Sequence, residues 1–166
     1  MMKKVMFLLV AMLLSFSVSA ATLTLGLNGS SNADQEIDFS TGTLVGGSGK
    51  TDGGTWYSDF TLTTDEDTQA VVEFSFNPES AVSTALLSIT NRVTGIATEW
   101  LGAGDLIVSY FFETGVAYGI DFYSVTSTQL KYDVSVSAVP VPAALFLFAP
   151  ALLGFFGLRR KAAVAA

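Results

Sequence analysis

Strict alternation between apolar and polar residues in the middle of the chain is the feature that most limits its fold. The last alternating segment covers residues 128–137, and residues 115–124 repeat the same pattern. A period of two describes a strand with one buried and one solvated face. The apolar positions of the last segment are Leu130, Tyr132, Val134 and Val136. The sequence therefore predicts a domain built from antiparallel β-strands.

Turn residues divide the middle of the chain into eight or nine short strands. Many short strands separated by Gly, Pro, Asn and Asp are typical of two packed sheets. We therefore predict an all-β fold, an antiparallel β-sandwich or jelly-roll-like domain. The predicted strands are 22–27, 36–45 (interrupted), 55–63, 69–76, 83–90, 94–99, 106–112, 115–124 and 128–137.

Two segments carry more specific expectations. Residues 106–112 are almost continuously apolar, which predicts a central strand buried on both faces. Residues 28–54 are poor in large apolar side chains, and residues 46–49 read Gly-Gly-Ser-Gly. We expect these glycines to break the strand pattern and residues 28–54 to be the least ordered part of the domain.

The N-terminus has the three parts of a secretory signal peptide. Two lysines follow Met1 and Met2, residues 5–14 are apolar, and small residues lead up to Ala20 and Ala21. This order predicts a signal peptide over residues 1–21, removed by signal peptidase after Ala20 or Ala21. The mature chain is therefore expected to be exported.

The C-terminus has the length and charge of a membrane anchor. Residues 139–158 form 20 positions without a charge, followed by Arg159, Arg160 and Lys161. A helix of that length spans about 30 Å, the thickness of a bilayer core. We expect a transmembrane helix over residues 141–158, with the basic stop in the cytoplasm and the domain at 22–138 outside.

The tail at residues 139–166 resembles the PEP-CTERM sorting signal of exported bacterial proteins. A proline motif at 139–145, the apolar span and the basic stop occur in the order of that signal. Its name-giving Pro-Glu-Pro reads Pro-Val-Pro in this chain, with valine at Val141. The motif residues that carry the resemblance are Val139, Pro140, Val141, Pro142, Ala143 and Ala144.

The resemblance implies a route for the protein. Members of that family belong to Gram-negative bacteria that make exopolysaccharide and biofilm. An exosortase, a membrane-embedded cysteine transpeptidase, is thought to recognise and cleave them near the motif. The domain would first lie in the periplasm, tethered to the inner membrane, and would reach the cell surface or the extracellular space after processing.

Charge and missing residue types exclude several functions. All 15 acidic residues lie between 22 and 139, against three basic residues there, which gives that segment a net charge of −12. Such a domain repels nucleic acid and anionic lipid, and the charge favours solubility. The chain lacks His and Cys, which removes Ser-His-Asp and Cys-His catalysis and the usual zinc sites. We expect no enzyme, with the strand carboxylates Glu73, Glu99, Glu113 and Asp121 facing solvent.

Calcium is the one cofactor that the acidic segments suggest. Ca²⁺ prefers several oxygen ligands from a flexible acidic loop. Neither candidate group matches an EF-hand loop, so ordinary turn chemistry stays as the alternative. The candidate ligands are Asp34, Glu36 and Asp38 in one segment, and Asp65 and Asp67 in another.

Aromatic residues suggest a second kind of ligand. Trp56, Tyr57 and Trp100 would form a platform for a sugar ring if exposed, or part of the core if buried. Two functions follow from the sequence. The first is a non-catalytic structural protein of the cell envelope or extracellular matrix. The alternative is a carbohydrate- or Ca²⁺-binding module associated with extracellular polysaccharide.

Overall fold

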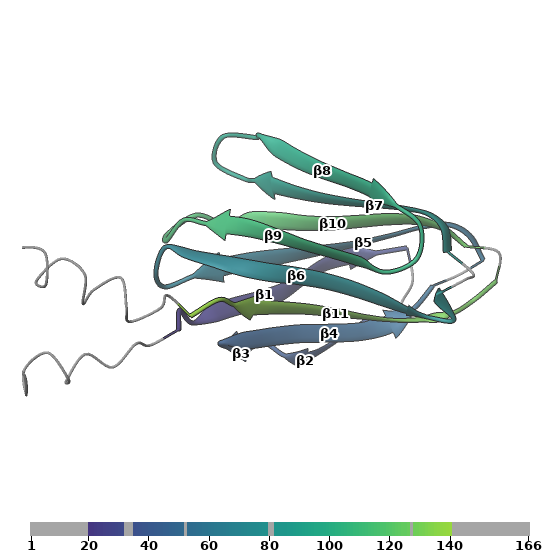
Figure 1. Ribbon diagram of the computed structural model, residues 1–166, viewed down its shortest axis with the longest axis horizontal. Coiled ribbons are helices and arrows are strands. Elements are labelled where there is room, and N and C mark those ends of the chain that lie inside the picture. The colour runs from purple at the N-terminus through teal and green to yellow at the C-terminus, as the bar shows by residue number, and fades with distance from the viewer. Residues whose placement is uncertain (1–19, 32–34, 52, 80–81, 127, 141–166) are drawn as a thin grey trace, which may run out of the picture. The chain divides into compact units, whose positions relative to one another are not determined.

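The domain is a sandwich of two antiparallel β-sheets, as predicted (Figure 1). The computed structural model describes residues 20–31, 35–51, 53–79, 82–126 and 128–140. The six-stranded sheet has the order β3(Thr41–Gly42), β1(Leu23–Ser30), β5(Gly54–Thr64), β10(Tyr118–Thr126), β7(Val82–Asn91), β8(Ala97–Gly102). The five-stranded sheet has the order β2(Glu36–Phe39), β4(Leu44–Lys50), β11(Lys131–Ala138), β6(Thr68–Asn77), β9(Leu106–Phe112).

The strand pairs show how the chain is folded back on itself. Strand β4 pairs with β11, β5 with β10, β6 with β9, and β7 with β8. The four strands β4 to β7 thus pair with the four strands β8 to β11 in reverse order, as in one long hairpin that is rolled into two sheets. This is the pairing of an eight-stranded jelly roll. Strand β1 adds to the side of β5, and β2 to the side of β4.

The alternating segments supply the core, as predicted. The predicted inward residues of β11 are at most 4 % exposed, and Phe74 of β6 and Phe122 of β10 are fully buried. The rings of Phe74 and Phe122 stack across the two sheets with their centroids 4.4 Å apart. Burial of each such ring contributes roughly 1.5–3 kcal/mol to folding, so the period of two carries most of the information for the core.

The prediction for residues 106–112 was wrong. Strand β9 forms the edge of its sheet and pairs only with β6 among the described strands. Its outward side chains Ile107 and Phe111 are 65 % and 54 % exposed. A central strand and an edge strand can carry the same apolar run, because hydrophobicity does not say what covers the outer face.

The prediction for the glycines at 46–49 was also wrong. They lie within β4, which is paired on both sides, with β2 and with β11. A Cβ on Gly49 would stand 2.7 Å from the ring of Tyr132, closer than side chains pack. The missing side chain therefore admits the large core ring of Tyr132 instead of breaking the strand.

Three predicted strand starts are shifted by three residues each, and one of them is that of β11, which begins at Lys131 instead of residue 128. The predicted strand at 94–99 begins at Ala97, because Asn91 Oδ1 accepts the backbone N–H groups of Val93 and Thr94. Gly95 has a φ of 72°, which closes this turn and suits a residue without a Cβ. Strand β10 begins at Tyr118, three residues after the predicted start.

Both ends of the compact unit Ala21–Val139 lie at the β5–β6 turn. The backbone N–H of Thr22 donates to Asp65 Oδ1 at 2.7 Å, and the N–H of Val139 donates to the carbonyl of Gln69 at 2.8 Å. Within the described ranges, we find no helix with the length and apolarity that a bilayer crossing requires. Residues 1–19 and 141–166, which carry most of the predicted signal peptide and sorting signal, lie outside the described residues.

Candidate functional site

The outer face of the six-stranded sheet carries a row of large apolar side chains across four strands. We call it the apolar row. It contains Tyr57 on β5, Tyr123 on β10, Leu86 on β7 and Leu101 on β8, each directly opposite the next. Tyr57 and Tyr123 are 44 % and 45 % exposed, and their ring centroids lie 6.2 Å apart at an inclination of 30°. The two phenol rings thus form a continuous exposed surface.

A second row of polar side chains lies two residues further along these strands. We call it the carboxyl row. It contains Asp59 on β5, Asp121 on β10, Ser88 on β7 and Glu99 on β8, again in register. Side chains two residues apart share a face of a strand, so the two rows run side by side. Acidic acceptors therefore border the apolar row.

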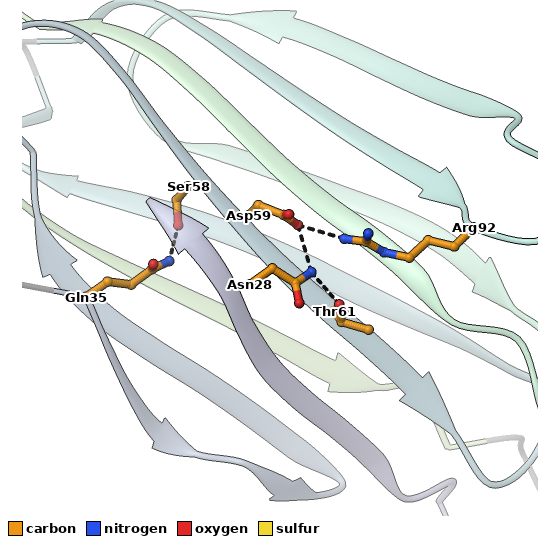
Figure 2. A network of polar contacts seen from close by, with 6 residues as sticks. All are labelled: Asn28, Gln35, Ser58, Asp59, Thr61 and Arg92. Carbon is orange, nitrogen blue, oxygen red and sulfur yellow. Dashed lines mark hydrogen bonds and ion pairs between the residues drawn. The ribbon is translucent and has the colours of Figure 1, made fainter. Parts of the chain in front are cut away.

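Asp59 is the centre of a polar network on this face (Figure 2). Arg92 Nη2 donates to Asp59 Oδ1 at 2.9 Å, and Asn28 Nδ2 donates to the same oxygen at 3.1 Å. Asn28 Nδ2 also donates to Thr61 Oγ1. These contacts join β1, β5 and the turn after β7. The network holds the Asp59 carboxylate in one orientation on the sheet surface.

Gly119 leaves room for the guanidinium group of this network. It lies opposite Thr61 in the β10–β5 pair. A Cβ at this position would stand 3.1 Å from Arg92 Nη2. The planar guanidinium therefore lies against the backbone of β10 and remains partly open, with the Arg92 side chain 41 % exposed.

The two central carboxyl groups interact strongly. The pKa of Asp121 is raised from 3.8 to about 6, chiefly because partial burial disfavours its charged form. Repulsion from Asp59 and a hydrogen bond with it raise the pKa further, while Arg92 acts in the opposite direction. The pKa of the Tyr123 hydroxyl is raised by burial and then by Asp121 and Asp59. Under mildly acidic conditions, the Asp121 carboxyl group is therefore largely protonated.

This arrangement suits an amphipathic ligand such as a sugar. A pyranose ring has apolar C–H faces that pack on aromatic rings and a rim of hydroxyl groups that bond to carboxylates, amides and guanidinium groups. Asp59 and Asp121 lie directly opposite each other in the β5–β10 pair, so both carboxyl groups border the same part of this surface.

The three predicted aromatic candidates are separated by the structure. Tyr57 lies on the outer face, whereas Trp56 is fully buried and packs on Tyr132 with ring centroids 4.6 Å apart. Trp100 is half-buried on the inner side of β8, with its ring edge-on to Tyr110 at 6.1 Å. Only Tyr57 of the three contributes to the exposed platform.

Most of this site was not predicted from the sequence. The prediction for Asp121 and Glu99, as solvent-facing strand carboxylates, did not place them beside Asp59, Asn28 or Arg92. One feature of the sequence does indicate the exposed aromatic surface, because Tyr57 and Tyr123 occupy polar-face positions of their alternating strands. The other named carboxylates lie elsewhere, Glu73 on β6 of the five-stranded sheet and Glu113 in the turn after β9.

The proposed calcium ligands have other contacts in the described part of the chain. Asp65 accepts the N–H of Thr22, and Asp67 Oδ1 accepts the N–H of Thr114 at 2.8 Å. Glu36 and Asp38 lie exposed on the short strand β2, and Asp34 falls outside the described residues. Among described residues, no three acidic side chains converge on a metal-sized space. The calcium site stays a prediction.

Comparisons with known proteins yield only distant structural likenesses. No family model and no curated protein matches the sequence. One similar solved structure is TmCBM61 in complex with β-1,4-galactotriose, with 7 % identity, a TM-score of 0.42, and coverage of 72 % of this chain and 88 % of that chain. Another is the arabinose-bound α-L-arabinofuranosidase MgGH51, with 10 % identity, a TM-score of 0.34, and coverage of 78 % and 28 %. At these scores, neither likeness defines a family or a ligand for this chain.

Proposed function

We propose that this protein is a non-catalytic carbohydrate-binding module that attaches to extracellular polysaccharide. The observation that carries the proposal is the exposed pair Tyr57 and Tyr123, in register and bordered by the fixed Asp59 network. Aromatic surface and orienting polar groups together are what a small-molecule or glycan site requires. A purely structural role in the envelope or matrix does not require such a pairing.

The position of the rows on the sandwich supports this role. Both ends of the compact unit lie at the β5–β6 turn, next to Thr64 at the end of β5. Tyr57 precedes Thr64 by seven residues, which corresponds to about 23 Å along a strand. The aromatic pair therefore lies toward the end of the domain opposite the two connecting segments. A tethered domain would present that end outward.

A binding assay with a matched control tests the proposal. The full chain, kept in a detergent without a sugar headgroup, is titrated with a panel of soluble polysaccharides by calorimetry. We expect binding to at least one of them, and at least tenfold weaker binding after Tyr123→Ala, because stacked aromatic anchors dominate such interfaces. Phe111→Ala removes a ring of similar exposure from the five-stranded sheet and should leave the affinity unchanged. Equal losses in both variants contradict a site on this face.

The delivery route completes the proposal. We propose that signal peptidase cleaves after Ala20 or Ala21 and that the tail first tethers the domain to the inner membrane. An exosortase would then act near Pro142, and the mature domain would stand at the cell surface or outside the cell.

Two measurements test this route. Deletion of residues 139–166 should release the domain from the membrane fraction, and a truncated protein that still sediments with membranes contradicts the tether. Mass spectrometry of the mature C-terminus should show an end near Pro142 only when the exosortase is present. A C-terminus that still ends at Ala166 in strains with and without the exosortase contradicts processing.

A further inference from the structure

The carboxyl row also suggests which glycans the site accepts. Resting on the proposed function, we infer that Asp59 and Asp121 make this face selective for uncharged glycans and reject chains that carry carboxylate or sulfate groups. The two aspartates are thus specificity-determining residues beside the aromatic pair. The inference names the chemical class of the ligand, which the proposed function leaves open.

The spacing of the two rows is the first support. Asp59 lies two residues after Tyr57 on β5, and Asp121 lies two residues before Tyr123 on the antiparallel strand β10, so each aspartate is the next side chain on the same face. Any sugar stacked on the two rings therefore has its rim within reach of both carboxyl groups. Hydroxyl groups on that rim donate to carboxylates, whereas a carboxylate or sulfate there meets like charge.

The placement of the basic residues is the second support. Arg92 is the one cation of this face among the described residues, and its Nη2 is 2.9 Å from Asp59 Oδ1. Its charge thus offsets a carboxylate of the row rather than standing free for an anionic ligand. Lys50 and Lys131 lie on β4 and β11 of the other sheet. The segment 22–139 carries a net charge of −12, so the electrostatic potential of the whole domain is negative, like that of the carboxyl row.

Protonation should weaken the selectivity, because it removes one of these charges. The charged and titratable groups around Asp121 are Asp59 and Tyr57 of β5, Tyr123 of its own strand, and Arg92 after β7. Its direct neighbour on β7 is Ser88, which is uncharged, and Glu99 of β8 lies one strand beyond. Below about pH 6, Asp121 is largely protonated, so this face carries one negative charge fewer.

Matched neutral and acidic polysaccharides test the inference. The probes are hydroxyethylcellulose with carboxymethylcellulose, galactan with polygalacturonate, and dextran with dextran sulfate. The full chain in a detergent without a sugar headgroup is titrated at constant ionic strength. At pH 7.5, we expect the neutral member of at least one pair to bind at least tenfold more tightly than its acidic partner. At pH 5, this ratio should fall at least threefold.

Charge-removing variants distinguish this inference from the proposed function. Asp121→Asn keeps the side-chain shape, so we expect at least threefold tighter binding of the acidic member at pH 7.5. The neutral-to-acidic affinity ratio of this variant should be at least threefold lower than that of the parent chain at pH 7.5 and should no longer change with pH. Asp133→Asn removes one exposed charge from β11 on the other sheet and should change neither value.

The possible results distinguish failure of the selectivity from failure of the proposed function. Binding of both members with equal affinity, lost in Tyr123→Ala, overturns the selectivity while the proposed function stands. An equal gain in Asp133→Asn and Asp121→Asn assigns the effect to net charge and also overturns the inference. No binding of any of the six probes overturns both proposals. Circular dichroism of each variant confirms that the fold is retained.

Discussion

The two outer faces of the sandwich differ in organisation although both expose large apolar side chains. On the five-stranded sheet, Ile107 and Phe111 stand exposed near a hydrogen bond from Gln69 Nε2 to Ser109 Oγ at 2.8 Å. On the six-stranded sheet, the exposed rings of Tyr57 and Tyr123 adjoin each other and a cross-strand carboxyl network. Exposed hydrophobic residues alone are ordinary on protein surfaces. Their coupling to oriented polar groups is what distinguishes a candidate site.

The carboxyl groups of the two faces also differ in their electrostatic environment. Asp121 is partly buried and opposes Asp59, so its pKa is raised to about 6. Asp133 on β11 is exposed and lies opposite Ser75 and Ser48. The six-stranded face thus holds two carboxyl groups together at an energetic cost, as functional surfaces often do.

The largest expected difference concerns ligand binding. Removal of both rings in Tyr57→Ala with Tyr123→Ala should weaken polysaccharide binding at least 100-fold, because the apolar contact surface is lost. The matched double variant Ile107→Ala with Phe111→Ala removes two exposed side chains from the other face and should bind like the parent chain. Calorimetry measures both. A similar loss in the two double variants would remove the distinction between the faces.

A smaller difference is expected in the pH dependence of stability. A raised pKa means that the folded state binds the Asp121 proton more tightly, so stability falls as the pH rises from about 3.8 to about 6. Asp121→Asn should therefore stabilise the domain at pH 7.5 by about 1 kcal/mol, after solvent screening of a partly exposed group. At pH 4, most of this gain should vanish.

Thermal unfolding measures this effect, and a gain of about 1 kcal/mol corresponds to roughly 3–5 °C in Tm. Asp133→Asn on the other face is the control and should show no gain that disappears at low pH. An equal gain in Asp121→Asn at both pH values would mean that burial and Asp59 do not perturb the carboxyl group.

The smallest difference concerns the polar contacts of the two faces. Asn28→Ala removes donors to Asp59 and Thr61 and should cost about 1 kcal/mol. Gln69→Ala removes one exposed hydrogen bond to Ser109 and should cost less than about 0.5 kcal/mol. Urea unfolding at pH 7.5 measures both values. The comparison is contradicted if Gln69→Ala costs more than Asn28→Ala.

The sequence predicted the core better than the surface. Alternation at Tyr132, Val134 and Phe74 identified buried positions, because a strand in a two-layer sandwich has one inner face. The glycine-rich strand β4 escaped notice, since a missing side chain looks like a break until the ring of Tyr132 is found in the space. The apolar strand β9 was misplaced, since its position at a sheet edge depends on pairing partners far along the chain.

The candidate site was out of reach of the sequence for a related reason. Asp59 and Asp121 are 62 residues apart, as the numbering shows, and only the pairing of β5 with β10 makes them neighbours. Arg92 reaches Asp59 from the turn after β7, across the glycine at position 119. No local pattern encodes these contacts.

The sequence by itself determined the all-β class, the inward face of most strands and the acidic charge of the domain. These properties depend on the period of the chain and on its composition, which are local. Only the tertiary structure decided which strands lie at the edges and which outward residues adjoin. Strand register across a jelly roll joins residues distant in sequence, and this register placed Tyr57 beside Tyr123 and Asp59 beside Asp121.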